Sequence, residues 1–354
     1  MQDASPPTRD IRPFAATLLR SGARAIASHA AEHLLDSNPH AGDLFGDKAY
    51  RRWQDSLGQR IEELAAAVEF GSPELFTRDV AWSVAAFAAR QVPLETVAAS
   101  LDALKAAVLE DLPPHCLAAV TPIVDAGLEA ARGEPMRLTR LSASTPHGEL
   151  ALRFLEIVLD GRRQAATDVI LDAFEAGTPV ADIYERVLLP VESELGTMWH
   201  LGEVSVPEEH AASEAIRGTM AVLSRAAYKK SDPEPRQGAV LVGAVEGDRH
   251  DIGVRAVADL LEIAGFTAVY LGADVPTRDL VRACESFNTQ ALVLSAMLTV
   301  HVPSIAEAIK AVRAAGDYRV IVGGGAFRAD PELAARIGAH RYAASTTDVV
   351  KALA

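Results

Sequence analysis

The chain of 354 residues has few of the residue types that mark several common classes of protein. Its two cysteines, Cys116 and Cys284, give neither a disulfide framework nor the spacing of a zinc site. Only 5% of the residues are aromatic, and 34 basic residues are outnumbered by 48 acidic ones. The net charge of −14 argues against direct binding of nucleic acid, which needs a basic surface.

Long apolar runs are also missing from the sequence. No stretch approaches the roughly 18 uncharged residues that a membrane-spanning helix needs. Residues 1–10 are polar and contain prolines, so we expect no signal peptide. The sequence therefore predicts a cytoplasmic protein without a membrane partner, and its length suits two or three domains.

From residue 238 onward, short apolar runs alternate with helical patterns. The predicted strands are 239–244, 267–271, 291–296, 319–323 and 341–344. The predicted helices are 251–265, 277–287, 302–315, 330–338 and 346–353. This alternation predicts an α/β Rossmann-like (flavodoxin-like) fold, a parallel sheet with helices on both faces. In such sheets ligands bind beyond the C-terminal ends of the strands.

Polar and small residues gather at those predicted strand ends. They are Asp248, His250, Gly253, Ser295, Met297, Gly323, Gly324 and Gly325. No G-x-G-x-x-G follows the first strand, which disfavours a nicotinamide-binding domain. One interpretation of Asp248 and His250 is an ordinary strand-to-helix turn that carries these two side chains.

A strand followed by Asp-x-His-x-x-Gly resembles the cobalamin-binding domains. The resemblance implies that His250 is the lower axial ligand of cobalt, and that Asp248 holds its other ring nitrogen. It also implies that Gly253 leaves room for the nucleotide tail and that Ser295 bonds the buried dimethylbenzimidazole. The glycines at 323–325 would let the backbone approach the tail. Met297 stands where this family usually has leucine.

Residues 149–230 contain four helical patterns ahead of this domain. These are 149–159, 162–176, 180–201 and 206–229, separated at Gly161, Gly177 and Gly202. A four-helix bundle before a cobalamin fold resembles the cap of methionine synthase and the corrinoid methyl carriers. In those proteins the bundle covers the upper face of the corrin.

Two helix ends meet within this bundle. Ser205-Val206-Pro207-Glu208 predicts a capping box, so a helix begins near Ser205. Trp199 and His200 then close the preceding helix, while Glu209 and His210 lie in the first turns of the next. A core position for Trp199, and a favourable charge at a helix N-terminus for Glu209, are the simpler explanations.

The spacing Trp-x9-Glu-His resembles the light-sensing cobalamin domains of the CarH family. The resemblance implies that Trp199 shields an adenosyl group, against which Val206, Glu209 and His210 pack. It further implies that His200 replaces the adenosyl group as the upper cobalt ligand after photolysis.

Residues 11–132 show only helical patterns. The predicted helices are 11–36, 47–69, 73–90, 93–111 and 114–132, and a linker follows over 133–148. Their number and length suit an all-α, globin-like domain. The expected organisation is thus a helical domain and linker over 1–140, a bundle over 141–234 and the cobalamin-binding domain over 235–354.

This order of domains resembles the photocobilins, which combine cobalamin with biliverdin. Aromatic and basic residues that could hold biliverdin cluster at Tyr50, Arg51, Arg52 and Trp53. An ordinary amphipathic helix with Trp53 in the core explains the same cluster. His29, His33 and His40 could instead ligate haem.

The main hypothesis is a light sensor that binds adenosylcobalamin and biliverdin. Breakage of the Co–C bond by light would change the quaternary structure of a homo-oligomer, or its contacts with an unknown signalling partner. Without a recognisable catalytic domain, we do not expect an enzyme. The alternatives are a corrinoid methyl carrier of a methyltransferase system, and a B12-binding signalling module with a haem or other sensor globin. A methyl carrier would share His250, Ser295 and the bundle, but it gives no reason for the spacing of Trp199 and Glu209.

Overall fold

The computed structural model describes residues 10–136 and 141–354, which form two compact units divided between residues 136 and 137. The boundary falls within the predicted linker, whose residues 137–140 lie outside the described residues. The bundle and the sheet belong to the same unit. No helix in the described parts of the chain is long and apolar enough to cross a membrane.

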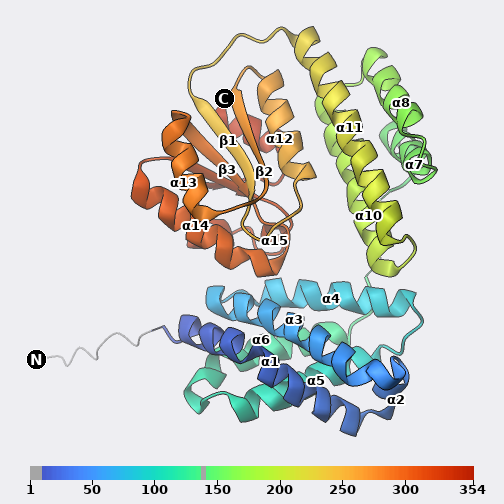
Figure 1. Cartoon of the computed structure of the whole chain (residues 1–354), viewed down its shortest axis with the longest axis vertical. Coiled ribbons are helices and arrows are strands. Elements are labelled where there is room, and N and C mark those ends of the chain that lie inside the picture. The colour runs from blue at the N-terminus through green and yellow to red at the C-terminus, as the bar shows by residue number, and fades with distance from the viewer. Residues whose placement is uncertain (1–9, 137–140) are drawn as a thin grey trace, which may run out of the picture. The chain divides into compact units, whose positions relative to one another are not determined.

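The first unit is helical, as the sequence predicts (Figure 1). Its elements are α1 (Arg12–Ser37), α2 (Pro39–Asp43), η1 (Gly46–Lys48), α3 (Ala49–Phe70), α4 (Pro73–Ala89), α5 (Glu95–Asp111) and α6 (Pro114–Ala131). Prolines open α2, α4 and α6, where a missing N–H costs no helical hydrogen bond. The short elements α2 and η1 were not predicted, and the globin-like label stays a prediction.

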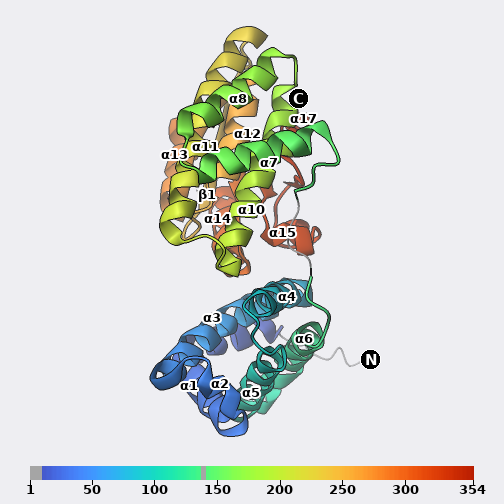
Figure 2. The same ribbon diagram turned by 90° about the vertical axis from the view of Figure 1, so that its right-hand side faces the viewer.

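Small residues let the helices of this unit pack closely. Helix α1 packs on α3 and α5, and α4 packs on α6 (Figure 2). A Cβ atom added to Gly127 of α6 would lie 2.4 Å from the ring of Phe76 on α4. The α4–α6 contact therefore requires glycine at this position.

The second unit begins with the bundle. Its elements are α7 (Pro146–Leu159), α8 (Arg163–Glu175), α9 (Val180–Ile183), η2 (Tyr184–Leu188), α10 (Leu189–Leu201) and α11 (Val206–Ser231). The single helix predicted over 180–201 is interrupted by η2, a π-helical turn. Pro190 follows it, and its ring disfavours a regular α-helical turn on its N-terminal side. Pro146 opens α7, although the sequence predicts the linker to extend to residue 148.

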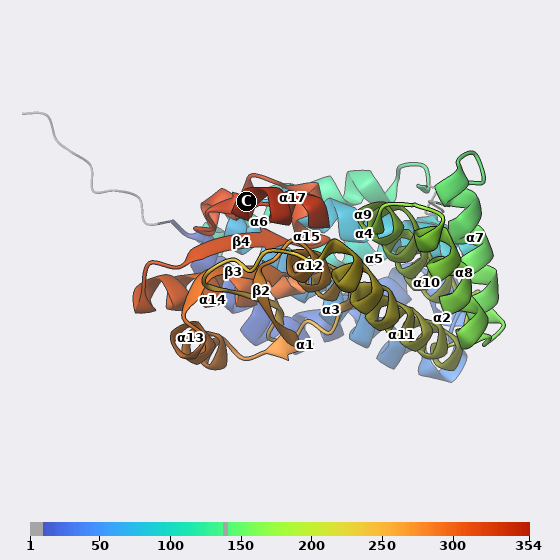
Figure 3. The ribbon, with the colours of Figure 1, turned by 90° about the horizontal axis from the view of Figure 1, so that it is seen from above.

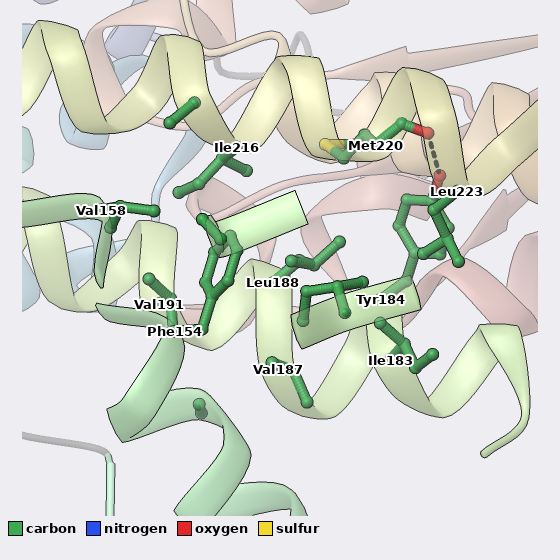
Figure 4. Close-up of a cluster of buried hydrophobic side chains, with 14 of the residues drawn as sticks. Phe154, Val158, Ile183, Tyr184, Val187, Leu188, Val191, Ile216, Met220 and Leu223 are labelled. Carbon is green, nitrogen blue, oxygen red and sulfur yellow. Dashed lines mark hydrogen bonds between the residues drawn. The ribbon is translucent and has the colours of Figure 1, made fainter. Parts of the chain in front are cut away.

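The bundle closes around one apolar core. Figure 4 shows side chains from α7, η2, α10 and α11 that meet there, including Phe154, Leu188 and Ile216. The phenol oxygen of Tyr184 lies in this core, 3.4 Å from the carbonyl oxygen of Met220. Burial of these side chains is the main stabilising contribution to the bundle.

The sheet is parallel throughout, in the order β2-β1-β3-β4-β5. Its strands are β1 (Ala239–Val245), β2 (Thr267–Val275), β3 (Thr289–Ser295), β4 (Arg319–Gly323) and β5 (Arg341–Tyr342). Its helices are α12 (Ile252–Ile263), α13 (Thr277–Ser286), η3 (Thr299–His301), α14 (Val302–Ala315), α15 (Ala326–Ala329), α16 (Leu333–Arg336) and α17 (Thr346–Leu353). The helix predicted over 330–338 is shorter in the structure, where α16 covers only Leu333–Arg336.

Helices cover both faces of the sheet. Helices α12 and α17 pack together, and their side chains join one apolar cluster with β1 and β3. Helices α13 and α14 pack together on the other side of the sheet (Figures 1 and 3). Every residue of β1 is buried, as expected for a central parallel strand. The strand order reverses between β1 and β3, so the switch point lies beyond the C-terminal ends of these two strands.

Candidate functional site

Asp248 lies at the switch point, three residues after β1, and its side chain has no solvent exposure. Its Oδ1 accepts hydrogen bonds from the backbone N–H of His250 at 3.0 Å and from Nδ1 of His250 at 2.7 Å. Its Oδ2 accepts the N–H of Met297, beyond β3, at 2.7 Å. The carboxylate thus ties the loop after β1 to the loop after β3.

His250 is oriented by this carboxylate. Its Nδ1 must carry the proton that Asp248 accepts, which leaves Nε2 as the nitrogen that can bind a metal. The side chain is half exposed. The hydrogen bond to Asp248 raises the pKa of His250; burial opposes the shift, and the charges of Glu192 and Glu209 add to it.

The ionised form of Asp248 is strongly favoured. Burial alone would raise its pKa, but the hydrogen bonds from His250 and the influence of His301 hold the pKa well below its usual range. The Nδ1 atom of His301 lies 3.5 Å from Oδ2 of Asp248, but without the geometry of a hydrogen bond. His301 was missed in the sequence, although it ends η3 in the segment that follows β3, where ligands are expected.

A second acidic residue that was missed, Asp274, supports the same loop. Its carboxylate accepts the N–H of Gly247 at 2.7 Å, and its own N–H donates to the carbonyl of Asp248 at 2.8 Å. Asp274 lies at the end of β2 and has a positive φ of 52°. The ends of β1, β2 and β3 therefore hold the loop that carries His250.

The predicted glycines fall into two groups. A Cβ atom on Gly324 would lie 2.4 Å from the carbonyl oxygen of Ala296 and 2.7 Å from Oγ of Ser295. A Cβ atom on Gly325 would lie 2.7 Å from atoms of Met297. These glycines, which follow Gly323 at the end of β4, let the loop pack against the end of β3. Gly253 has open space around its Cα, as expected where room is needed.

The predicted cap residues lie at the junction of α10 and α11. Trp199 and His200 are in the last turn of α10, which ends before Gly202 at a φ of 79°. The predicted capping box is confirmed, since Glu208 Oε2 accepts the N–H of Ser205 at 2.7 Å.

Three of these side chains are exposed. Half of the Trp199 surface and half of the Val206 surface reach solvent, and His210 is exposed as well. The Nδ1 atom of His210 lies 2.7 Å from the carbonyl oxygen of Val206. Trp199 is therefore not a core aromatic.

Glu209 belongs to a carboxylate pair that the sequence did not reveal. The hydroxyl of Ser213 lies 2.8 Å from Oε1 of Glu209 and 3.1 Å from Oε1 of Glu192 on α10. The Ser213 hydroxyl has one hydrogen and can donate it to only one carboxylate. If the other carboxylate is protonated, it can donate its own hydrogen to the Ser213 oxygen. Burial, together with the charge of Glu209, raises the pKa of Glu192 to about 7, although the Ser213 hydrogen bond opposes the shift.

Charged side chains also join the bundle to the sheet domain. Arg217 of α11 donates to Asp251 at 2.8 Å, and the same carboxylate accepts the hydroxyl of Tyr270 at 2.6 Å. Because Asp251 directly follows His250, the bundle is fixed next to the residue that would hold a metal.

The bilin site predicted at residues 50–53 gains no support from the structure. Trp53 is 2% exposed and donates its indole N–H to the carbonyl of Ala41 at 2.9 Å, whereas Tyr50, Arg51 and Arg52 are exposed. The cavity that Trp53 lines has a volume of about 30 Å³, too small for a tetrapyrrole. The four residues thus divide between core and solvent and do not line one pocket.

Comparison with known families gives two matches within the second unit. A B12 binding domain model matches residues 238–354, and a second B12 binding domain model matches residues 150–224. The two matches correspond to the sheet domain and to most of the bundle. They support a cobalamin or corrinoid cofactor; they give no support for the adenosyl form or for biliverdin.

Individual proteins match both parts together. Trimethylamine corrinoid protein 1 of Methanosarcina mazei is 31% identical over 205 residues, which cover 57% of this chain and 94% of that protein. A corrinoid protein of Desulfitobacterium hafniense is 26% identical over 200 residues, 55% of this chain and 92% of that protein. A solved structure, that of a monomethylamine corrinoid protein from Methanosarcina barkeri, matches with a TM-score of 0.50 and 22% sequence identity. The match covers 58% of this chain and 97% of that structure, and it supports the fold.

These comparisons contradict the light-sensor hypothesis. The Methanosarcina mazei relative is named for trimethylamine, the Desulfitobacterium hafniense relative is named only as a corrinoid protein, and neither is named as a photoreceptor. The assignment of His200 as an upper ligand formed by photolysis falls with that hypothesis. The methyl-carrier alternative agrees better with the relatives.

Proposed function

Because this chain belongs to the family of corrinoid proteins, we propose that residues 137–354 carry a methyl group on a bound corrinoid between partner methyltransferases. The observation that carries this proposal is the match to trimethylamine corrinoid proteins along nearly their whole length. On this proposal the chain is a carrier and not itself an enzyme. The methyl donor and acceptor belong to its partners.

The residues at the switch point fit a corrinoid. Cobalamin, when bound, supplies a cobalt centre that accepts and releases a methyl group. His250 would hold the cobalt through Nε2, because Asp248 engages Nδ1 and fixes the ring. The side chain is half exposed, so part of it is open to a ligand from solvent. The open space at Gly253 leaves room for the nucleotide tail.

The cap residues fit the transfer of a small group. Trp199 and Val206 are each half exposed, at one end of the bundle. Such side chains would shield a methyl group from water while leaving a face on which a partner can dock. We therefore expect the methyl form of the cofactor to be the functional one.

The proposal can be tested with the untagged full-length protein loaded with hydroxocobalamin. The bound cofactor is reduced and treated with methyl iodide, and absorption spectra record formation of the methylated protein. Cell extract from the source organism and a thiol acceptor are then added. We expect the methyl–cobalt spectrum to disappear only when both are present, with the methyl group recovered on the thiol.

The His250→Ala variant serves as the matched control, because it removes the lower ligand and leaves the cap unchanged. A protein that binds the cofactor but neither takes up nor releases a methyl group under any of these conditions would contradict the carrier role.

A further inference from the structure

Two helices of the first unit bring metal-ligating side chains together. His29 and His33 are four residues apart on α1 and share one face of the helix. Helix α1 packs on α5, whose last two residues are Glu110 and Asp111. Ligand atoms of His29, His33 and Glu110 all lie within 4.8 Å of one another.

The separations suit ligands of one metal ion. The two Nε2 atoms of His29 and His33 are 3.0 Å apart. Glu110 lies 3.3 Å from His29 Nε2 through Oε2 and 3.8 Å from His33 Nε2 through Oε1. Ligands at zinc–nitrogen bond lengths in a tetrahedral site are separated by roughly 3.3 Å.

The other nitrogen of His29 faces a second carboxylate. Its Nδ1 lies 3.3 Å from Oδ2 of Asp111, which can only accept a hydrogen bond when ionised. The proton of a neutral His29 therefore belongs on Nδ1, and the lone pair of Nε2 faces Glu110 and His33. The Nε2 atom of His29 then faces other hydrogen-bond acceptors, which is unfavourable unless a proton or a metal ion lies between them. A carboxylate on the outer nitrogen is the usual support of a ligand histidine.

An independent argument comes from the position of the carboxylates on α5. Glu110 and Asp111 stand in the last turn, where the helix dipole is negative, and no basic residue shares that turn. Two carboxylates are unfavourable at this end of a helix without a cation. A bound divalent ion would offset both charges.

We propose that His29, His33 and Glu110 bind a divalent transition-metal ion, with zinc as the best fit, and that Asp111 orients His29. Three protein ligands leave a fourth position for water or a small anion. A groove of about 390 Å³ lined in part by His33, Ser37 and Asp102 adjoins the site. The proposal does not rest on the corrinoid function, because all of its residues belong to the first unit.

The same geometry bears on haem. Two nitrogens that converge on one point cannot be axial ligands on opposite faces of a haem iron. His40 is on α2 and is paired with Asp43 at 3.6 Å, outside the cluster. The pair His29–His33 is thus a better site for a single small ion.

The test is zinc titration of the untagged full-length protein, after chelator treatment, by calorimetry and elemental analysis. Elemental analysis counts zinc and the cobalt of cobalamin separately. We expect one zinc ion per chain, with affinity reduced by more than tenfold in His29→Ala, His33→Ala and Glu110→Gln. The matched control, His40→Ala, removes an exposed histidine of the same unit and should bind zinc like the parent protein.

Thermal unfolding supplies a second measurement. Zinc should raise the unfolding temperature of the parent protein and of His40→Ala, but not that of His29→Ala, because only the folded state holds the site. Glu110→Gln keeps the shape of the side chain, so its loss of binding would not reflect misfolding. Absence of zinc binding in the parent, or zinc affinity in Glu110→Gln and His29→Ala equal to that of the parent, would overturn the proposal.

Discussion

The hydroxyl of Tyr184 donates a 2.6 Å hydrogen bond to Oδ2 of Asp259, and both side chains are buried. Tyr184 lies on the π-helical turn of the bundle, and Asp259 lies on α12 of the sheet domain. Burial and the neighbouring carboxylate raise the pKa of Tyr184 far above its usual range, so the phenol stays protonated as the donor. The bond therefore joins the bundle to the sheet domain.

Replacement of Tyr184 by phenylalanine tests this contact. The change removes only the hydroxyl and leaves Asp259 buried without its tyrosine donor, which should destabilise the second unit by about 1–3 kcal/mol. Chemical denaturation monitored by the absorbance of bound cobalamin measures the loss. Tyr228→Phe, which removes an exposed phenol from α11, should change stability little. Equal effects of the two changes would mean that the Asp259 bond contributes nothing specific.

The orientation of His250 gives a second prediction. His250→Ala should remove the lower ligand and shift the spectrum of bound cobalamin, while Asp248→Asn should lower cofactor affinity by about 10- to 100-fold, as loss of an outer-shell partner does. Titration of the purified variants with cobalamin measures both. Arg249→Ala changes an exposed residue between them and is the control. An unchanged spectrum in His250→Ala would reject this residue as the cobalt ligand.

The sequence predicted the parts of the fold that depend on local pattern. The parallel strands were predicted from runs of apolar residues. The Asp248–His250 contact joins residues only two positions apart, so a short sequence motif is enough to predict it. His301 was missed because it approaches Asp248 from another loop. Glu192 was missed because its surroundings depend on how α10 packs against α11.

The errors have physical explanations too. The spacing of Trp199 and Glu209 places them on either side of the turn between α10 and α11. It does not identify the group that would bind the upper face of cobalt. In α3, Trp53, Leu57 and Ile61 recur every four residues and are all buried, so periodicity assigns Trp53 to the core. The alternative given for this cluster, an ordinary amphipathic helix with Trp53 in the core, agrees with that periodicity.

Gly324 and Gly253 are predicted to have different roles, the first in folding and the second in binding the cofactor. Gly324→Ala should destabilise the protein, because its φ is 100° and its Cβ would meet a backbone oxygen at 2.4 Å. Gly253→Ala meets open space and should leave the stability of the cofactor-free protein nearly unchanged. If Gly253 makes room for the nucleotide tail, the same change should weaken cobalamin binding. Thermal unfolding without cofactor, followed by titration, separates the effects; unimpaired binding by Gly253→Ala would remove its assigned role.

Glu192 predicts a pH dependence of stability. Its pKa is raised from 4.5 to about 7 by burial, which the charge of Glu209 reinforces. Between these values the folded protein keeps the proton that the unfolded chain has lost, so rising pH favours unfolding. The stabilising contribution is fully present below pH 4.5 and is lost as the pH rises through 7, with an upper limit of roughly 3 kcal/mol.

Glu192→Gln should remove this dependence, because an amide does not titrate and can still contact Ser213. The variant should gain stability relative to the parent as the pH increases from 5 to 8, which denaturation at a series of pH values measures. Glu203→Gln, an exposed position between α10 and α11, is the matched control and should follow the parent curve. If parent and Glu192→Gln differ by the same amount at pH 5 and pH 8, the proton is held elsewhere. The contact of Ser213 with two carboxylates makes Glu209 the next residue to replace in that case.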